Sequence, residues 1–132
     1  MAENSRTAIL VVEDEPLPRM DLVDTLSNAG YEVLEATNAH EALGYLQNGQ
    51  RVDVIITDIQ LGDDLTGWDV AEKFRAARQD IPIIYTSGTA GDRRRSVPGS
   101  VFFRKPFRLW DILKVCRGFG SVEIRGNSST RL

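Results

Sequence analysis

Residues 8–15 have the sequence Ala-Ile-Leu-Val-Val-Glu-Asp-Glu, in which an unbroken apolar run stops at three acids. A continuous run of aliphatic residues is typical of a strand that is buried on both faces. A second stretch of this kind, Asp-Val-Ile-Ile-Thr-Asp at residues 53–58, also ends in an acid. Helical patterns follow both stretches, and this order predicts an α/β protein with a parallel sheet.

The rest of the chain repeats the alternation of strand and helix. We expect five strands, at residues 8–12, 32–36, 53–57, 82–86 and 101–103. We expect helices at residues 16–29, 39–46, 68–78 and 108–117. Asn38 with Glu41 three residues later resembles a capping box, and Gly30 is placed to end the first helix. These patterns predict one domain over residues 7–117 and a flexible tail over residues 118–132.

Composition excludes several classes of protein. The chain has 132 residues with one cysteine, Cys116, and one histidine, His40. A disulfide within the chain, a cysteine-based metal site and a multi-histidine metal centre are therefore excluded. The longest apolar run, residues 8–12, is far too short to span a membrane, and residues 1–7 are polar and too short for a secretion signal. We expect a cytoplasmic protein.

The net charge of −3 hides a division along the chain. Residues 1–87 contain 16 acidic and 6 basic residues, whereas residues 88–132 contain 3 acidic and 10 basic residues. Such segregation suits an acidic pocket folded against basic groups, or a basic face offered to a partner. The run Arg93-Arg94-Arg95 has no interleaved aromatic residues, so a solvated loop or a protein-docking site is favoured over nucleic-acid binding.

Charged and hydroxyl side chains follow four of the five expected strands, at the end of each strand. They are Glu13 and Asp14, Asp58, Ser87, and Lys105. Right-handed crossovers bring the carboxyl ends of parallel strands to one edge of the sheet, where ligands bind. Clustered carboxylates repel one another, and a hard divalent cation such as Mg²⁺ relieves that repulsion. Carboxylates, Mg²⁺ and a lysine together are what the handling of a phosphoryl group requires.

This set of residues resembles the receiver domain of two-component response regulators over about residues 7–117. The resemblance rests on Glu13-Asp14, Asp58, Ser87-Gly88 and Lys105-Pro106-Phe107, which match in order and spacing. It implies a flavodoxin-like, doubly wound sheet of strand order 2-1-3-4-5. It also implies that Asp58 accepts a phosphoryl group from a histidine kinase or a histidine phosphotransfer protein.

The resemblance implies a Mg²⁺ site at this edge. Asp14 and Asp58 would bind the ion directly, with the backbone carbonyl of Gln60 as a third ligand and Glu13 acting through a bound water. Glu13 stands where an aspartate is commoner, and the loop after Asp58 carries two further acids, Asp63 and Asp64. We expect these two acids in a solvated loop rather than at the metal.

The resemblance also assigns the groups that would hold the phosphoryl oxygens. Lys105 would pair with one oxygen, and the Ser87 hydroxyl with the Gly88 amide would bind another. Phe102 would be the aromatic switch residue that turns inward when Ser87 is engaged. Because it is a phenylalanine, its inward position would rest on packing alone.

The connection between Ser87 and Lys105 is shorter than is usual in the family. Residues 89–100 lack an apolar stripe, and Val97 is the only large apolar residue there. We expect the fourth helix of the family fold to be missing, very short or mobile. This stretch resembles a subgroup of single-domain bacterial receivers that is often paired with histidine kinases of the HWE type.

Three functional hypotheses remain open. The first is a single-domain response regulator that switches partner binding or relays phosphate, without a DNA-binding domain and with only weak self-catalysed phosphotransfer and autodephosphorylation. The second is a pseudo-receiver that binds proteins and never accepts phosphate, although Asp14, Asp58, Ser87 and Lys105 speak against it. The third is a hydrolase of small phosphorylated molecules. Haloacid-dehalogenase-type enzymes need Asp-x-Asp, whereas Asp58 is followed by Ile59-Gln60.

Overall fold

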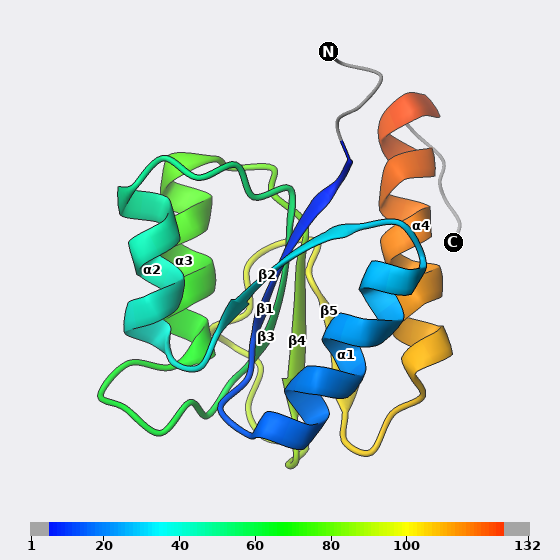
Figure 1. The fold of residues 1–132 in the computed structure, drawn as a ribbon. Helices are drawn as coiled ribbons and strands as arrows, with labels where there is room; N and C mark the ends of the chain where they lie inside the picture. Colours follow the sequence, from blue (N-terminus) through cyan, green and yellow to red (C-terminus); the bar gives the residue numbers. More distant parts are fainter. Residues whose placement is uncertain (1–5, 126–132) are drawn as a thin grey trace.

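The computed structural model describes residues 6–125, with side chains through residue 119, and its centre is a parallel five-stranded sheet (Figure 1). The strand order is β2-β1-β3-β4-β5, as the family resemblance implies. The strands are β1 (Ala8–Val12), β2 (Glu32–Ala36), β3 (Val54–Asp58), β4 (Ile83–Ser87) and β5 (Val101–Arg104). The apolar runs therefore form the predicted strands, with β3 and β4 shifted by one residue toward their carboxyl ends.

Helices cover both faces of the sheet. In Figure 1, α2 (Ala39–Gln47) and α3 (Gly67–Ala77) lie on one side, and α1 (Pro16–Asn28) and α4 (Leu109–Arg125) lie on the other. Each face of the sheet has its own hydrophobic core, and alternate residues of β1 belong to one or the other. Leu10 and Val12 pack toward α2 and α3, whereas Ile9 and Val11 pack toward α1 and α4. Among residues 6–125, no helix has both the length and the apolar character that crossing a membrane requires.

The helix starts follow local sequence signals. Asn38 caps α2 by accepting a hydrogen bond from the Glu41 amide at 2.8 Å, as predicted. The Glu41 carboxylate accepts a hydrogen bond from the Thr37 amide at 2.7 Å, so the second half of the capping box is made one residue earlier than the pattern indicates. A complete capping box starts α3, between Thr66 and Asp69.

The last helix is longer than predicted. It continues to Arg125 instead of ending at Arg117, because Val115, Cys116 and Phe119 extend its apolar side along the core shared with α1. Residues 118–132, predicted to be a flexible tail, therefore belong to this helix as far as Arg125. Residues 126–132 lie outside the described residues.

The connection from β4 to β5 contains no helix. Residues 88–100 form turns and irregular backbone, which agrees with the prediction that the family's fourth helix is short or missing. The chain reverses near Gly99, whose φ of +76° lies in the left-handed region that glycine adopts without strain. Only Val97 in this segment is buried, and a single apolar anchor cannot hold a helix against the sheet.

Candidate functional site

The carboxyl ends of the strands meet at one edge of the sheet, at the bottom of Figure 1, and the predicted residues meet there. Glu13 and Asp14 follow β1, Asp58 ends β3, Ser87 ends β4, and Lys105 follows β5. Parallel pairing in register sets this arrangement, since Asp58 lies opposite Thr86 and Ser87 lies opposite Arg104. The Lys105 amide donates to the Ser87 carbonyl at 2.7 Å, which ties the last two strand ends together.

Three carboxylates are clustered at this edge around one ammonium group. Oxygen atoms of Glu13, Asp14 and Asp58 lie within 4.8 Å of one another. Glu13 and Asp58 are buried, whereas Asp14 is exposed. Lys105 Nζ donates to Glu13 Oε1 at 2.8 Å and to Asp58 Oδ2 at 3.0 Å. A buried carboxylate needs such a partner, because an unpaired one is costly to remove from water.

Burial and ion pairing act against each other in this cluster. Burial raises the pKa of the Glu13 carboxyl, and this effect outweighs the hydrogen bonds from Lys105 and the Glu15 amide, which lower it. For Lys105, burial alone would lower the pKa of the ammonium group, but the hydrogen bonds to Glu13 and Asp58 outweigh burial and leave the pKa raised. Lys105 is therefore a fixed positive charge beside Asp58 at physiological pH.

The backbone around Asp58 is held by a very close approach of α3. The Gly67 amide donates to the Ile59 carbonyl at 2.7 Å. A Cβ atom built on Gly67 would lie 2.2 Å from the Asp58 carbonyl oxygen, so only glycine allows the helix to begin here. Nothing in the sequence pattern singled out Gly67, because the requirement comes from a neighbour nine positions earlier in the chain.

The donor set fits a hard divalent cation. Three carboxylates face a single ammonium group, so the cluster carries an excess of negative charge that Mg²⁺ would neutralise through oxygen ligands. Gln60, whose backbone carbonyl is the third predicted protein ligand, is exposed in the loop that follows β3. The same loop passes beside the site at Gly62, where a Cβ atom would lie 3.5 Å from Asp14 Oδ2.

The other two acids of this loop belong to a separate cluster. Asp64 Oδ1 lies 2.8 Å from His40 Nε2 on α2, and Asp63 Oδ2 lies 3.9 Å from the same nitrogen. His40 therefore has a carboxylate partner on the surface. Hydrogen bonding to Asp64 raises the pKa of His40.

Ser87 is buried, and its hydroxyl already has a partner. Its Oγ accepts from the Thr89 amide at 3.2 Å and lies 3.3 Å from Thr89 Oγ1. A hollow of about 160 Å³ opens beside it, lined also by Gln60, Trp68 and Phe102. Phe102, the predicted switch residue, is thus placed at the same small space as Ser87.

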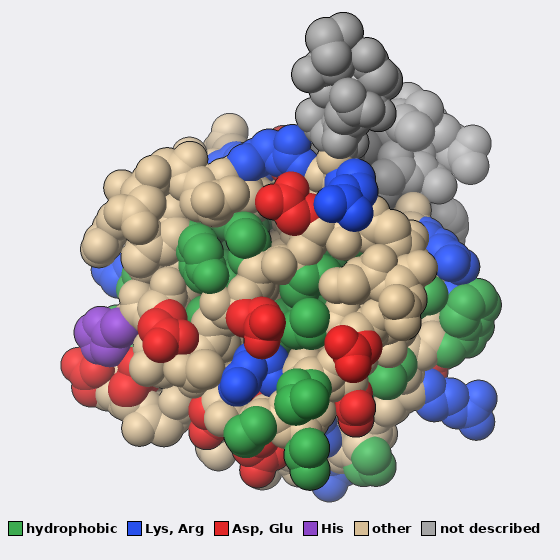
Figure 2. Space-filling view, in the orientation of Figure 1, with side chains coloured by type: hydrophobic (Ala, Val, Ile, Leu, Met, Phe, Trp, Pro, Cys, Tyr) green, Lys and Arg blue, Asp and Glu red, His purple; other side chains and the backbone are tan. Residues whose placement is uncertain are grey.

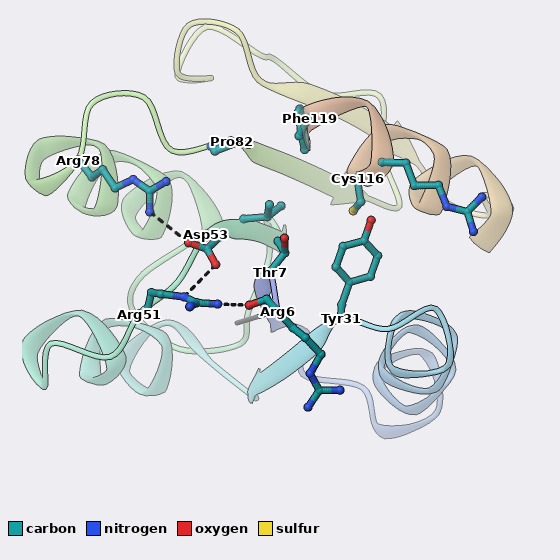
Figure 3. Close-up of a pocket in the computed structure, with 11 residues that line it drawn as sticks. Arg6, Thr7, Tyr31, Arg51, Asp53, Arg78, Pro82, Cys116 and Phe119 are labelled. Atoms are coloured by element: carbon teal, nitrogen blue, oxygen red, sulfur yellow. Dashed lines mark hydrogen bonds and ion pairs between the residues drawn. The ribbon is translucent and has the colours of Figure 1, made fainter. Parts of the chain in front are cut away.

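A second hollow, of about 340 Å³, lies at the opposite edge of the sheet (Figure 3). Four arginines line it, but Arg51 and Arg78 form ion pairs with Asp53 at 3.1 and 3.8 Å, and the Arg6 side chain points away in Figure 3. Arg78 also donates to the Val52 carbonyl at 2.8 Å. These contacts tie together the segments that precede the strands, and no predicted site residue lies there.

Comparison with known proteins finds a family match over most of the chain. A family model described as the response regulator receiver domain matches residues 9–116. A probable transcriptional regulatory protein of Picosynechococcus is 33% identical over an alignment of 124 positions, which covers 86% of this chain and 49% of that protein. The chain spans about half, or less, of the length of the curated relatives to which it is similar.

Solved structures with the same fold align over most of this chain. A response regulator receiver protein from Sinorhizobium medicae aligns with a TM-score of 0.83 and 29% identity, covering 86% of this chain and 94% of that one. The response regulator protein TrrA of Thermotoga maritima, solved in complex with Mg²⁺ and BeF, aligns with a TM-score of 0.73 and 28% identity, covering 85% of this chain and 97% of that one.

Proposed function

Because this chain belongs to the response regulator receiver domain family, we propose that Asp58 accepts a phosphoryl group from the phosphohistidine of a histidine kinase or a histidine phosphotransfer protein. The observation that carries the proposal is the buried Asp58 carboxylate with Lys105 Nζ at 3.0 Å and two further carboxylates beside it. In that setting Asp58 is a nucleophile next to a fixed cation and a cation-binding cluster.

The reaction would proceed by displacement at phosphorus. An Asp58 carboxylate oxygen forms a bond to phosphorus while the bond from phosphorus to the histidine nitrogen breaks. The imidazole keeps the electron pair of that bond and takes up a proton from solvent, and Asp58 becomes an acyl phosphate. The carboxylate oxygen is itself the nucleophile in this step, so Asp58 needs no separate base to activate it.

Asp14 and Asp58 would hold Mg²⁺ directly, with the Gln60 carbonyl as the third protein ligand and Glu13 acting through a water molecule. When bound, the ion would offset the negative charge that the phosphoryl oxygens bring to the three carboxylates. Lys105 would exchange part of its contact with Asp58 for one phosphoryl oxygen. Its second hydrogen bond, to Glu13 at 2.8 Å, keeps the ammonium in place during that exchange.

A second phosphoryl oxygen would be bound from the β4 side. The Ser87 hydroxyl would donate to it, and so would the Gly88 amide that follows. Ser87 gives up its present contact with Thr89 in doing so. Hydrolysis of the acyl phosphate by water would slowly reset the site, so the chain acts as a phosphoacceptor and not as an enzyme on a separate substrate.

An apolar surface beside Lys105 supports the docking of the phosphodonor protein. A hollow of about 450 Å³ is lined by Pro18 and Asp21 of α1 and by residues 105–107 and Leu109. On α1, Leu17 and Met20 are 73% and 53% exposed, and Figure 2 shows hydrophobic side chains gathered over the start of this helix. An apolar surface at the mouth of the site suits a helical phosphohistidine protein, which must bring its imidazole to Asp58.

Where the donor is a histidine kinase, we propose that it is of the HWE type. The helix-free segment 88–100 supports this assignment, because the receivers that this segment resembles are often paired with such kinases. The phosphorylated chain would then either bind a different protein partner or pass its phosphoryl group on.

Intact-mass spectrometry tests the proposal. The protein is incubated with Mg²⁺ and acetyl phosphate or phosphoramidate, and one phosphoryl group is expected on the wild type. Asp58→Asn removes the nucleophile at nearly constant volume and should give no adduct. Asp64→Asn is the matched control, because it makes the same change in an exposed acid outside the site and should be modified like the wild type.

The pseudo-receiver hypothesis makes the opposite prediction. A protein that only binds partners would gain no phosphoryl group from small donors or from any kinase, with or without Mg²⁺. An adduct of equal yield on Asp58→Asn would equally contradict the proposal, because it would place the modification elsewhere.

A further inference from the structure

The helix-free segment of residues 88–100 contacts the rest of the protein at several separate points. At its start, Thr89 contacts the Ser87 hydroxyl. Near its end, the Val97 amide donates at 3.1 Å to the hydroxyl of Tyr85, which is completely buried. Between these points lie the three arginines of residues 93–95. The segment thus replaces a helix with a chain of single contacts, and each contact can be removed by one substitution.

Each of the three arginines has a different partner. Arg95 forms ion pairs with Glu72 at 2.6 Å and Asp69 at 3.0 Å, both on α3. Arg94 is 90% exposed along its side chain and contacts Asp92 of its own turn. Arg93 places the centre of its guanidinium 3.9 Å from the centroid of the Phe102 ring. Only Arg93 therefore touches the predicted switch residue.

The Phe102 ring on which Arg93 stacks also lines the small hollow next to Ser87. Phe102, Ser87 and Thr89 all line this hollow, together with Gly91 and Asp92 from the segment that leads to Arg93. A guanidinium held over an aromatic face is an attractive contact, and it fixes the ring at the same time. Rotation of Phe102 or movement of residues 89–92 would separate the two groups.

We propose that Arg93 is a positioning residue of the switch, and that its stacking on Phe102 holds the ring and the segment 88–100 in the unphosphorylated arrangement. This inference rests on the proposed function of Asp58. When the Ser87 hydroxyl turns to a phosphoryl oxygen it leaves Thr89, and the segment from Thr89 to Arg93 loses its anchor at β4. Phe102 is then free to turn, and the Arg93 guanidinium becomes available to a partner.

The size of the effect follows from the strength of the contact. An exposed cation–π contact contributes about 0.5–1 kcal/mol, which is a factor of about two to five in an equilibrium constant. We call the arrangement in which Ser87 is free to bind a phosphoryl oxygen the receptive arrangement. If the contact between Arg93 and Phe102 exists only in the unphosphorylated arrangement, removing it raises the population of the receptive arrangement by that factor. A ligand that binds the receptive arrangement then binds more tightly by up to the same factor.

The test is the affinity of the protein for beryllofluoride in the presence of Mg²⁺, measured through the fluorescence of Trp68. Trp68 lines the hollow with Phe102, and Trp110→Phe removes the other tryptophan, which is 54% exposed and outside the hollow. In that background Arg93→Ala should lower the dissociation constant about two- to fivefold. Arg94→Ala is the matched control, and it should leave the dissociation constant unchanged.

A double-mutant cycle tests whether Arg93 acts through the aromatic ring. With Phe102→Leu, which has no ring to stack on, Arg93→Ala should have no further effect on the dissociation constant. An equal effect of Arg93→Ala in both backgrounds would overturn the proposal, and so would unchanged or weaker binding by Arg93→Ala alone.

The outcomes separate this inference from the proposed function on which it rests. If the wild type is phosphorylated on Asp58 and Arg93→Ala binds beryllofluoride with the same dissociation constant as the wild type, only the proposed role of Arg93 is wrong. If the wild type neither binds beryllofluoride nor accepts a phosphoryl group, the proposed function fails with it.

Discussion

Because α3 begins very close to the Asp58 backbone, replacing glycine by alanine should lower the free energy of unfolding at Gly67 but raise it at Gly44. An alanine at Gly67 would place its Cβ 2.2 Å from the Asp58 carbonyl oxygen and 3.0 Å from Ile59 Cα. Both neighbours are backbone atoms, so they cannot rotate away as the end of a side chain could. In α2, by contrast, a Cβ on Gly44 meets nothing within 4 Å.

The magnitudes follow from helix propensity and from overpacking. Replacing glycine by alanine inside a helix stabilises it by about 1 kcal/mol, and Gly44→Ala should raise the free energy of unfolding by about that amount. Gly67 is the first residue of its helix, so the propensity gain there is smaller. Forcing a methyl group into a filled space costs about 1–3 kcal/mol, and Gly67→Ala should therefore lower the free energy of unfolding.

Urea denaturation of the two variants and the wild type measures these effects, and phosphorylation by acetyl phosphate measures the effect on the site. Gly67→Ala should also slow phosphorylation, because the Asp58 backbone must move to admit the methyl group, whereas Gly44→Ala should not. A Gly67→Ala protein as stable as Gly44→Ala would refute the close approach.

Three further outcomes follow from the contacts of individual side chains. The pKa of His40 should lie above its ordinary value of 6.5 and fall in Asp64→Asn, as measured by NMR titration. Because a raised pKa favours the protonated folded state, the stabilisation from this pair should be present below pH 6.5 and disappear as the pH rises through the raised value. Met20→Asp should slow phosphotransfer from a cognate kinase but leave phosphorylation by acetyl phosphate unchanged, and equal rates from the kinase would refute the docking surface. Lys105→Met should reduce phosphorylation by either donor, since it removes the cation 3.0 Å from Asp58, and an unchanged rate would contradict its role.

The fold and the cluster of charged residues could be predicted from the sequence because both follow from the order of elements. Parallel strands bring their carboxyl ends to one edge, so side chains distant in sequence, such as Asp58 and Lys105, could be placed together before any coordinates. The missing helix was predictable for a similar reason, since a segment with one large apolar residue cannot form an apolar stripe.

Contacts that depend on how two segments distant in the sequence pack against each other could not be predicted. The need for glycine at position 67 comes from the path of the Asp58 backbone, and the partner of Arg93 comes from the way an irregular segment folds back over β5. Apolar spacing alone does not identify the buried side of α1, because Leu17 and Met20 share a spacing of three with Val23 and Leu26 but are exposed. The end of α4 could not be predicted either, because its apolar side continues to Phe119 past Arg117 and Gly118, where the pattern weakens.

The central claim is that the Asp58 carboxylate itself receives the phosphoryl group, and the most direct test identifies the modified residue chemically. Borohydride reduces an aspartyl phosphate to homoserine and releases phosphate, whereas free carboxylates are not reduced. Peptide mapping by mass spectrometry after treatment with Mg²⁺, acetyl phosphate and borohydride should find homoserine at position 58. Homoserine at the position of Asp14 or of another acid, or no homoserine in a phosphorylated sample, would contradict the account.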